Sequence, residues 1–121
     1  MSHSANPRYN ENVILKMTFE FAILCVKYSE ELDKERKFSI ANQILRSGTS
    51  IGANVKEAQN AESKKDFIHK LKIALKEADE LEYWLFLCEE LDTYPSTKNM
   101  VNKLLDIQKV INKIISTMSK R

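Results

Sequence analysis

Histidine and clustered carboxylates are the side chains that most often bind metal ions, and this chain holds them in only one suggestive spacing. His69 follows Asp66 by three residues, whereas the other histidine, His3, lies in a polar N-terminal stretch. A di-iron four-helix protein needs two Glu-x-x-His pairs and two further glutamates. The Asp66–His69 pair does not supply that ligand set, so we predict no metal site and no cofactor.

Nucleophilic catalysis is also poorly supported. Cys25 and Cys88 lie far apart in apolar stretches, without the CxxC spacing of zinc or redox sites and without a histidine in a recognisable pattern. The chain contains no GxSxG turn that would expose a catalytic serine. We interpret both cysteines as core thiols and expect the protein not to be an enzyme.

The strongest chemical pattern is a separation of charge along the chain. Residues 64–76 contain five lysines and one aspartate, whereas residues 77–92 contain seven acidic residues and no basic residue. On one helix this order is unfavourable, because the helix dipole favours anions near the N-terminus and cations near the C-terminus. We expect neighbouring helices or partners to offset the cost.

The composition indicates that helices position these residues. The 121 residues include only 2 glycines and 2 prolines, with 43% hydrophobic and 30% charged residues, which argues against an all-β fold and against disorder. The net charge of +2 does not by itself indicate a nucleic-acid partner. The sequence has no signal-peptide pattern and no membrane-spanning apolar run, so we expect a cytoplasmic protein without a membrane partner.

Apolar periodicity divides the chain into a short arm and one domain. Residues 1–10 mix small and polar residues without a period, which predicts a mobile N-terminal arm. Residues 11–119 form a single domain with four amphipathic segments. These segments lie at about 12–34, 38–61, 64–91 and 97–118. Because the connections are short, the predicted fold is an all-α, antiparallel, up-down four-helix bundle.

Local signals mark the boundaries of the last two segments. Ser63 and Asp66 resemble a capping box that opens the third helix. Pro95 ends that helix, because it cannot donate a backbone hydrogen bond and disfavours helical geometry in the preceding residue. Ser96 is then a candidate N-cap for the fourth helix.

The first segment carries more apolar surface than one bundle core can cover. One face is formed by Ile14, Met17, Phe21, Leu24 and Tyr28. A second apolar face, centred about 160° around the helix from the first, is formed by Leu15, Phe19, Ala22 and Val26. We interpret this second face as an interface with a partner subunit.

The second segment contains a stretch of poor helix formers, SGTSIGAN, at residues 47–54. Each glycine there costs about 1 kcal/mol relative to alanine. Either Gly48 and Gly52 let a neighbouring helix approach closely, or the stretch kinks the helix. A phosphate loop is disfavoured, because no strand pattern precedes the glycines and no GK[ST] ending follows them.

Two blocks carry a family resemblance: QILRSGTSIGANVKEAQ at residues 43–59 and SKKDFIHKLKIALKEADELEYWL at residues 63–85. Over residues 19–91 the chain resembles the four-helix-bundle proteins of the 23S rRNA intervening-sequence family. Many members of that family carry proline where this chain has Gly52. The positions on the family signature, for which we favour a structural or interface role, are Arg46, Gly48, Ser50, Ile51, Gly52, Asn54 and Glu57.

The role of Arg46 has two interpretations. It is expected to pair with a carboxylate, with Glu80 as a candidate, and so to fix the register of two helices. The alternative is that Arg46, Asn54 and Glu57 contact a ligand or RNA.

The resemblance implies an up-down bundle that assembles as a homopentamer and is encoded, in some bacteria, within inserts in large-subunit ribosomal RNA genes. It implies no established activity. A related accessory protein of diversity-generating retroelements forms a similar pentamer that binds nucleic acid and a reverse transcriptase. That analogy rests on the fold alone.

Antiparallel packing would place the end of the fourth helix beside the lysine-rich start of the third, and we call this end the basic pole. Its candidate nucleic-acid-binding residues are Lys64, Lys65, Lys70, Lys72, Lys113, Lys120 and Arg121. A homopentamer would concentrate their positive potential. We therefore expect a non-catalytic module that binds RNA or DNA with low sequence selectivity, because no aromatic residues alternate with the lysines.

Two alternatives remain for this pattern. The lysines can serve only as solvated faces that keep the protein soluble. The protein can instead be a scaffold or adaptor that binds another protein and makes no contact with nucleic acid.

Overall fold

The computed structural model describes residues 12–120, and these residues contain four α-helices. The helices are α2 (Val13–Lys34), α3 (Phe38–Ala58), α4 (Lys64–Glu90) and α5 (Lys98–Ser119). No strand occurs within the described range, so the all-α prediction is confirmed. The predicted N-terminal arm at residues 1–10 lies outside the described residues, as does Arg121.

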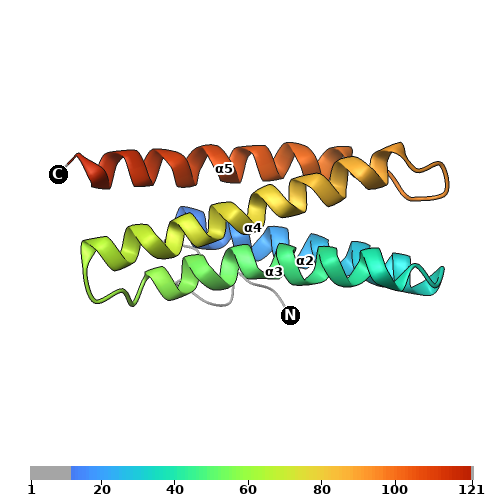
Figure 1. Cartoon of the computed structure of the whole chain (residues 1–121), viewed down its shortest axis with the longest axis horizontal. Coiled ribbons are helices and arrows are strands. Elements are labelled where there is room, and N and C mark those ends of the chain that lie inside the picture. Colours follow the sequence, from blue (N-terminus) through green and yellow to red (C-terminus); the bar gives the residue numbers. More distant parts are fainter. Residues whose placement is uncertain (1–11, 121) are drawn as a thin grey trace.

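The four helices lie side by side, and each runs opposite to the one before it (Figure 1). Asn12, which precedes α2, donates from Nδ2 to Oε1 of Gln59, which follows α3, over 2.9 Å. Gln108 near the middle of α5 donates from Nε2 to Oε1 of Glu82 in α4 over 3.0 Å. The starts of α2 and α4 therefore share one end of the bundle with the ends of α3 and α5.

Side-chain caps fix the starts of two helices. Asn12 Oδ1 accepts a hydrogen bond from the Leu15 N–H over 3.1 Å, and Ser63 Oγ accepts one from the Asp66 N–H over 3.0 Å. The second of these is the cap that the Ser63–Asp66 spacing predicts.

Two predicted boundaries are wrong by a few residues. The N-cap position of α5 is Thr97 rather than Ser96, and the Thr97 hydroxyl donates to the Leu85 carbonyl oxygen of α4 over 2.7 Å. This hydrogen bond holds Thr97 at the start of α5. It joins residues 12 positions apart in the chain, so a local sequence pattern does not predict it. α3 ends at Ala58 rather than Ala61, because the next three N–H groups donate to carbonyl groups three residues back, as in a 3₁₀ turn.

The core face of α2 differs from the apolar pattern. The buried residues of this helix are Ile14, Leu15, Thr18, Phe21, Cys25, Tyr28, Ser29 and Leu32. Met17 and Leu24, which belong to the first apolar face of the predicted pattern, are only partly buried. Thr18 can be buried because its hydroxyl donates to the Ile14 carbonyl oxygen over 2.8 Å. A polar residue with an internal partner thus occupies a core position that a hydrophobic pattern does not detect.

α3 is continuous through residues 47–54, and its glycines serve a close helix contact rather than a kink. A Cβ atom added at Gly48 would lie 2.7 Å from Cys25 Cβ, and one added at Gly52 would lie 3.3 Å from the Thr18 carbonyl oxygen. The first distance is too short for two carbon atoms. The absence of both side chains therefore lets α3 pack closely against α2.

The apolar residues of α4 and α5, which make the segments at 64–91 and 97–118 amphipathic, form much of the remaining core. The buried residues of α4 are Leu71, Ala74, Ala78, Leu81, Leu85 and Cys88. In α5 the buried residues are Met100, Leu104, Ile107 and Ile111. Ile114 and Met118, which continue the same pattern, are partly exposed, because the last turns of α5 extend beyond the first turn of α2 (Figure 1).

The connection between α4 and α5 is held by contacts from α2 and α4. Glu89 Oε1 accepts hydrogen bonds from the Thr97 N–H over 2.7 Å and from the Ser96 hydroxyl over 3.0 Å. The Tyr28 hydroxyl donates to the Pro95 carbonyl oxygen over 2.8 Å. The hydrogen bonds to Glu89, that from the Thr97 backbone above all, lower the pKa of its carboxyl group.

We expect the Gly48→Ala substitution to lower the free energy of unfolding by about 1–3 kcal/mol, because the new methyl group would displace Cys25. Urea unfolding at neutral pH measures this change. The control is Ala53→Gly, at an exposed position of the same helix. It should lower the free energy of unfolding only by the difference in helix propensity between alanine and glycine, about 1 kcal/mol. A Gly48→Ala variant that is more stable than the wild type would refute the close contact.

We expect the Glu89→Gln variant to be less stable than the wild type at neutral pH. Because the folded-state pKa of Glu89 is lowered from the ordinary 4.5, the ionised carboxylate stabilises the fold above that value. The advantage should disappear as the pH falls through the lower folded-state pKa. Urea unfolding between pH 3 and pH 7 tests this, with Glu90→Gln, the same substitution at an exposed neighbour, as the matched control. An equal loss of stability in both variants would contradict the role of the hydrogen bonds to Glu89.

Candidate functional site

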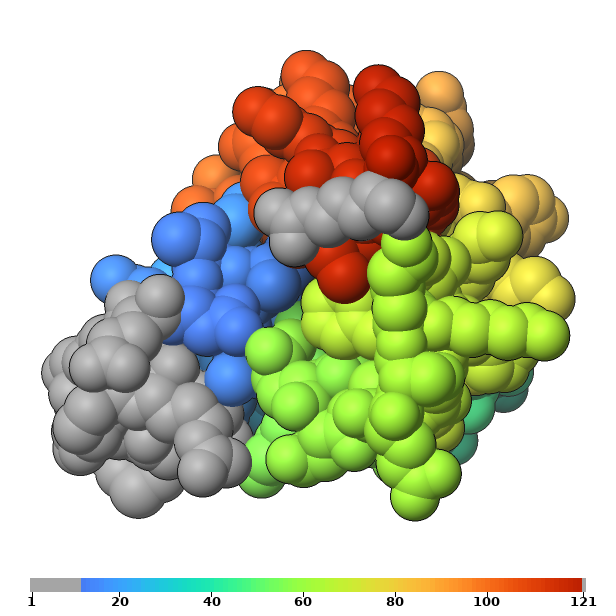
Figure 2. Space-filling view, turned by 90° about the vertical axis from the view of Figure 1, so that its left-hand side faces the viewer, coloured from blue at the N-terminus to red at the C-terminus, as the bar shows by residue number. Residues whose placement is uncertain are grey.

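The basic pole forms where the start of α4 and the end of α5 meet. Figure 2 looks onto this end, and residues around 60–70, in light green, project beside the red end of α5. Lys64 and Lys65 begin α4, and Lys120 follows the last α5 residue, Ser119. The structure therefore brings the two predicted groups of lysines to the same end of the molecule, apart from Arg121, which is outside the described residues.

Most lysines of the basic pole point into solvent. Lys65, Lys72, Lys113 and Lys120 are exposed, and none of the four forms an ion pair with another described residue. Lys64 is exposed as well. Lys70 is partly buried, and its Nζ lies 3.6 Å from Glu57 Oε2, so part of its charge is neutralised within the chain. At least four cations are thus available to an anionic partner.

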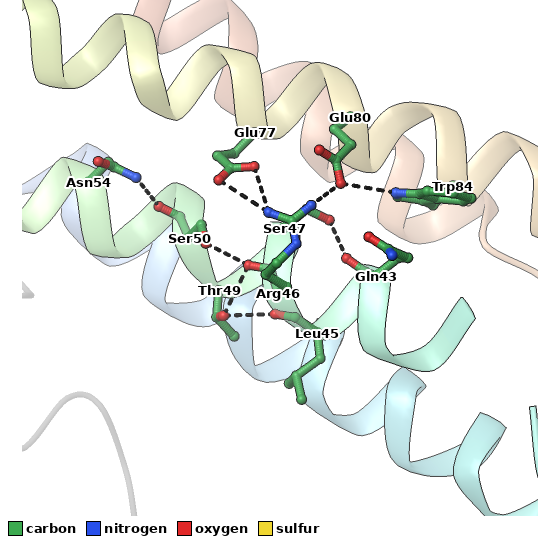
Figure 3. Close-up of polar contacts among 10 residues, drawn as sticks. All are labelled: Gln43, Leu45, Arg46, Ser47, Thr49, Ser50, Asn54, Glu77, Glu80 and Trp84. Carbon is green, nitrogen blue, oxygen red and sulfur yellow. Dashed lines mark hydrogen bonds and ion pairs between the residues drawn. The ribbon is translucent and has the colours of Figure 1, made fainter. Parts of the chain in front are cut away.

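Arg46 connects α3 to α4, as Figure 3 shows. Its Nη1 lies 3.2 Å from Glu77 Oε1, and its Nη2 pairs with Glu80 Oε2. Trp84 Nε1 donates to the same Glu80 oxygen over 3.2 Å. The pair with Glu80 agrees with the sequence expectation. Glu77 and Trp84 were not predicted, although residues 77, 80 and 84 lie on one helical face by their spacing.

The other polar signature residues make contacts on the same edge of α3. Asn54 Nδ2 donates to the Ser50 carbonyl oxygen over 2.8 Å, and Ser50 Oγ donates to the Arg46 carbonyl oxygen over 2.6 Å (Figure 3). Glu57 pairs with Lys70 of α4. Ile51 is fully buried. These intramolecular contacts favour a structural role for the family signature over a ligand contact.

Tertiary contacts offset the unfavourable charge order of α4. Arg46 neutralises two of the acidic residues. Gln108 Nε2 of α5 donates to Asp79 Oδ1 over 3.3 Å and to Glu82 Oε1 over 3.0 Å. Glu89 accepts from the residues that lead into α5. Neighbouring helices, rather than the dipole of α4 itself, therefore stabilise these anions.

One residue of the predicted oligomer interface is wrongly assigned. Leu15 is only 3% exposed, because it packs inside the single chain. Phe19 and Ala22 are partly exposed and line a shallow hollow of about 150 Å³ beside Thr49 and Ala53 of α3. Val26 is also partly exposed. The second apolar face of α2 is therefore a narrower surface patch than the sequence predicts.

Other chemistry is limited in the described part of the chain. Cys25 and Cys88 are buried thiols, and burial raises the pKa of Cys25 to about 12, which keeps it protonated. Residues 12–120 contain no group of three His, Cys, Asp or Glu side chains placed to hold a metal ion. Within this range, no helix combines the length and apolar character needed to cross a membrane.

A double-mutant cycle of Arg46→Ala and Glu80→Ala should give a coupling energy of about 0.5–1 kcal/mol in urea unfolding. The value is modest because the Arg46 side chain is 49% exposed and stays in contact with water. The coupling should fall as salt is added. A cycle of Arg46→Ala with Asp92→Ala, an exposed acid beyond the end of α4, is the control and should show no coupling. Equal coupling in both cycles would contradict a specific pair.

Comparison with known proteins places the chain in a family. The family described as 23S rRNA-intervening sequence protein matches residues 10–116. The chain is similar to a crystal structure of a protein with unknown function from the S23 ribosomal protein family of Bacteroides thetaiotaomicron. The TM-score is 0.81 and the identity 44%, over 85% of this chain and 98% of that one. No curated protein matches the chain. Because the family match spans most of its length, the protein belongs to the 23S rRNA-intervening sequence protein family.

Proposed function

We propose that this protein is a non-catalytic, cytoplasmic homopentamer that binds nucleic acid, and RNA in particular, through its basic pole. The observation that carries the proposal is the gathering of exposed lysines from α4 and α5 at one end of the bundle. Lysine contacts phosphate as a point charge, and phosphates are common to every nucleotide. Binding through these side chains should therefore have little sequence selectivity.

Assembly strengthens this proposal. A single chain carries a net charge of only +2, so long-range attraction to a phosphate backbone is weak. Repeating the basic pole around a ring adds the local fields of several lysine groups. The apolar residues that α2 leaves partly exposed support self-association, and the number five comes from the resemblance to family members.

A second candidate function is that of a scaffold or adaptor that binds another protein without contacting nucleic acid. The partly exposed side chains of Phe19, Ala22 and Val26 on α2 favour such a role. A pull-down from lysate with and without nuclease treatment separates the two functions, because a direct protein partner survives the nuclease and an RNA-bridged one does not.

We expect the quadruple charge reversal Lys64→Glu/Lys65→Glu/Lys70→Glu/Lys72→Glu to abolish most RNA binding. The smaller variant Lys65→Glu/Lys72→Glu should weaken binding and flatten the dependence of log affinity on log salt. For single-stranded RNA the slope should change by about 0.7 for each phosphate that the variant no longer neutralises. Fluorescence anisotropy with a labelled single-stranded RNA, titrated at several salt concentrations, measures both the affinity and the slope.

The matched control is Lys34→Glu/Lys98→Glu, which makes the same charge change at exposed positions of the opposite end. It should keep the wild-type salt slope. If both double variants lose the same affinity, only overall charge matters and the basic pole is not the site. If neither changes, the proposed binding function is wrong.

A further inference from the structure

Three lysines and a histidine of α4 form one row on the outer face of this helix. The row consists of Lys65, His69, Lys72 and Lys76, which are exposed and follow one another at steps of four, three and four. The three lysines form no ion pair with another described residue. His69 adds a ring N–H group that can donate to a phosphate oxygen. Residues 67–76 contain no acidic residue, so the row continues up to the acidic half of α4.

α5 carries a second row of lysines on its own outer face. Lys109, Lys113 and Lys120 are exposed, and their spacing of about one and two helical turns places them on one face. None of them forms an ion pair with a residue that the structure describes. Residues 107–120 contain no acidic residue. This row is therefore also free of neighbouring negative charge on its own helix.

The two rows lie on neighbouring, antiparallel helices. Gln108 Nε2 of α5 donates to Asp79 and Glu82 of α4, which fixes the register of the pair. A little more than one turn further toward the basic pole, Lys113 lies level with Lys76. We call the surface formed by both rows the lysine face. Its residues are Lys65, His69, Lys72, Lys76, Lys109, Lys113 and Lys120.

The surfaces on either side of the lysine face have mixed charge. On the far side of α5, a groove of about 630 Å³ lies between α2 and α5, and two lysines and two acidic residues line it. These residues are Lys27, Lys103, Glu20 and Asp106. On the far side of α4, Arg46 of α3 is paired with Glu77 and Glu80. The lysine face differs from both surfaces, because its cations have no acidic residue among them.

The exposed aromatic side chains lie away from the lysine face. Among the described residues they are Phe38, at the start of α3, and Tyr83 and Phe86 in α4. Tyr83 and Phe86 belong to residues 77–92, which contain seven acidic residues and no basic residue, so phosphate groups are repelled there. Proteins that hold single strands stack the bases on aromatic side chains beside a cationic groove. The lysine face offers phosphate contacts without such a stacking surface.

We propose that the nucleic acid bound at the lysine face is double-helical RNA. A duplex presents two phosphate backbones in a fixed shape and is recognised without unpaired bases. Each neutralised phosphate contributes about 0.9 to the salt slope of a B-form duplex and about 0.7 to that of a single strand, so counterion release favours the paired form. Binding by lysine charges alone therefore favours a duplex. This inference rests on the proposed function and names the form of nucleic acid and the face that holds it.

The affinities for the paired and unpaired forms of one RNA sequence test this inference. The probe is a labelled RNA strand without self-complementary segments, used alone and annealed to its complement. Fluorescence anisotropy at several salt concentrations gives the affinity and the salt slope for each form. The wild type should bind the duplex about tenfold more tightly than the single strand.

A variant with one change in each row tests the face. Lys76→Glu/Lys113→Glu should weaken duplex binding by about tenfold or more and flatten its salt slope. Lys76→Arg/Lys113→Arg keeps both charges and should bind the duplex as the wild type does. Circular dichroism confirms that each variant remains helical.

Two further variants serve as controls. Lys34→Glu/Lys98→Glu makes the same charge change at the opposite end of the bundle and should keep the preference for the duplex. Tyr83→Ala/Phe86→Ala removes two exposed aromatic side chains and should leave the affinity for both forms unchanged. A loss of single-strand binding in this variant would mean that bases stack on these side chains, which would overturn binding by phosphate contacts alone.

The outcomes separate this inference from the proposed function. If the single strand binds as tightly as the duplex, the double-helical form is wrong and the proposed binding of nucleic acid stands. If the duplex is preferred but Lys76→Glu/Lys113→Glu binds it as the wild type does, the lysine face is not the site. If neither form binds, this inference and the proposed function are both wrong.

Discussion

The close packing of α2 against α3 is the contact on which the rest of the bundle depends. The Cys25 side chain occupies the space where a side chain of residue 48 would be, and the Thr18 backbone lies against Gly52. Residues two apart on a helix are separated by about 200°. With its glycine edge against α2, α3 must therefore turn residues 46, 50 and 54 away from α2, and from there Arg46 reaches Glu77 and Glu80 of α4. The glycine contact thus orients the polar edge that meets α4.

That orientation brings Arg46 to the acidic half of α4. The guanidinium group holds Glu77 and Glu80 in place, and Gln108 and Thr97 from the α5 side bind other carboxylates of the same helix. An isolated α4 would be destabilised by its charge order, because acidic residues follow its lysines toward the negative end of the dipole. Inside the bundle, Arg46 of α3 binds two of these anions and Gln108 of α5 donates hydrogen bonds to two others. The charge separation is therefore retained at low cost, and lysines at the start of α4 form the basic pole.

The same charge separation divides the surface into regions with different roles. The basic pole lies at the end where α4 starts and α5 stops, and the acidic residues of α4 lie in the second half of the same helix.

Strong periodicity made much of the fold predictable. Local rules predict the apolar face of α4, the cap at Ser63 and the all-α class. A long amphipathic helix and its cap depend on residues that are close together in the sequence. The sequence also identified the lysines of the basic pole and the Arg46–Glu80 pair. In contrast, the core position of Thr18 was not predictable from hydrophobicity, because its burial depends on a hydrogen bond to its own helix.

The sequence by itself therefore determined four helices, their approximate limits and the separation of charge along α4. Only the tertiary structure decided which residues each helix buries, that Gly48 and Gly52 serve a close contact instead of a kink, and that Leu15 belongs to the core. It also decided that Thr97 rather than Ser96 precedes α5, and that α2 and α5 leave a groove between them. The physical reason is that helix formation depends on residues three and four apart, whereas burial, close approach and grooves depend on which helices meet, and those contacts join residues far apart in the chain.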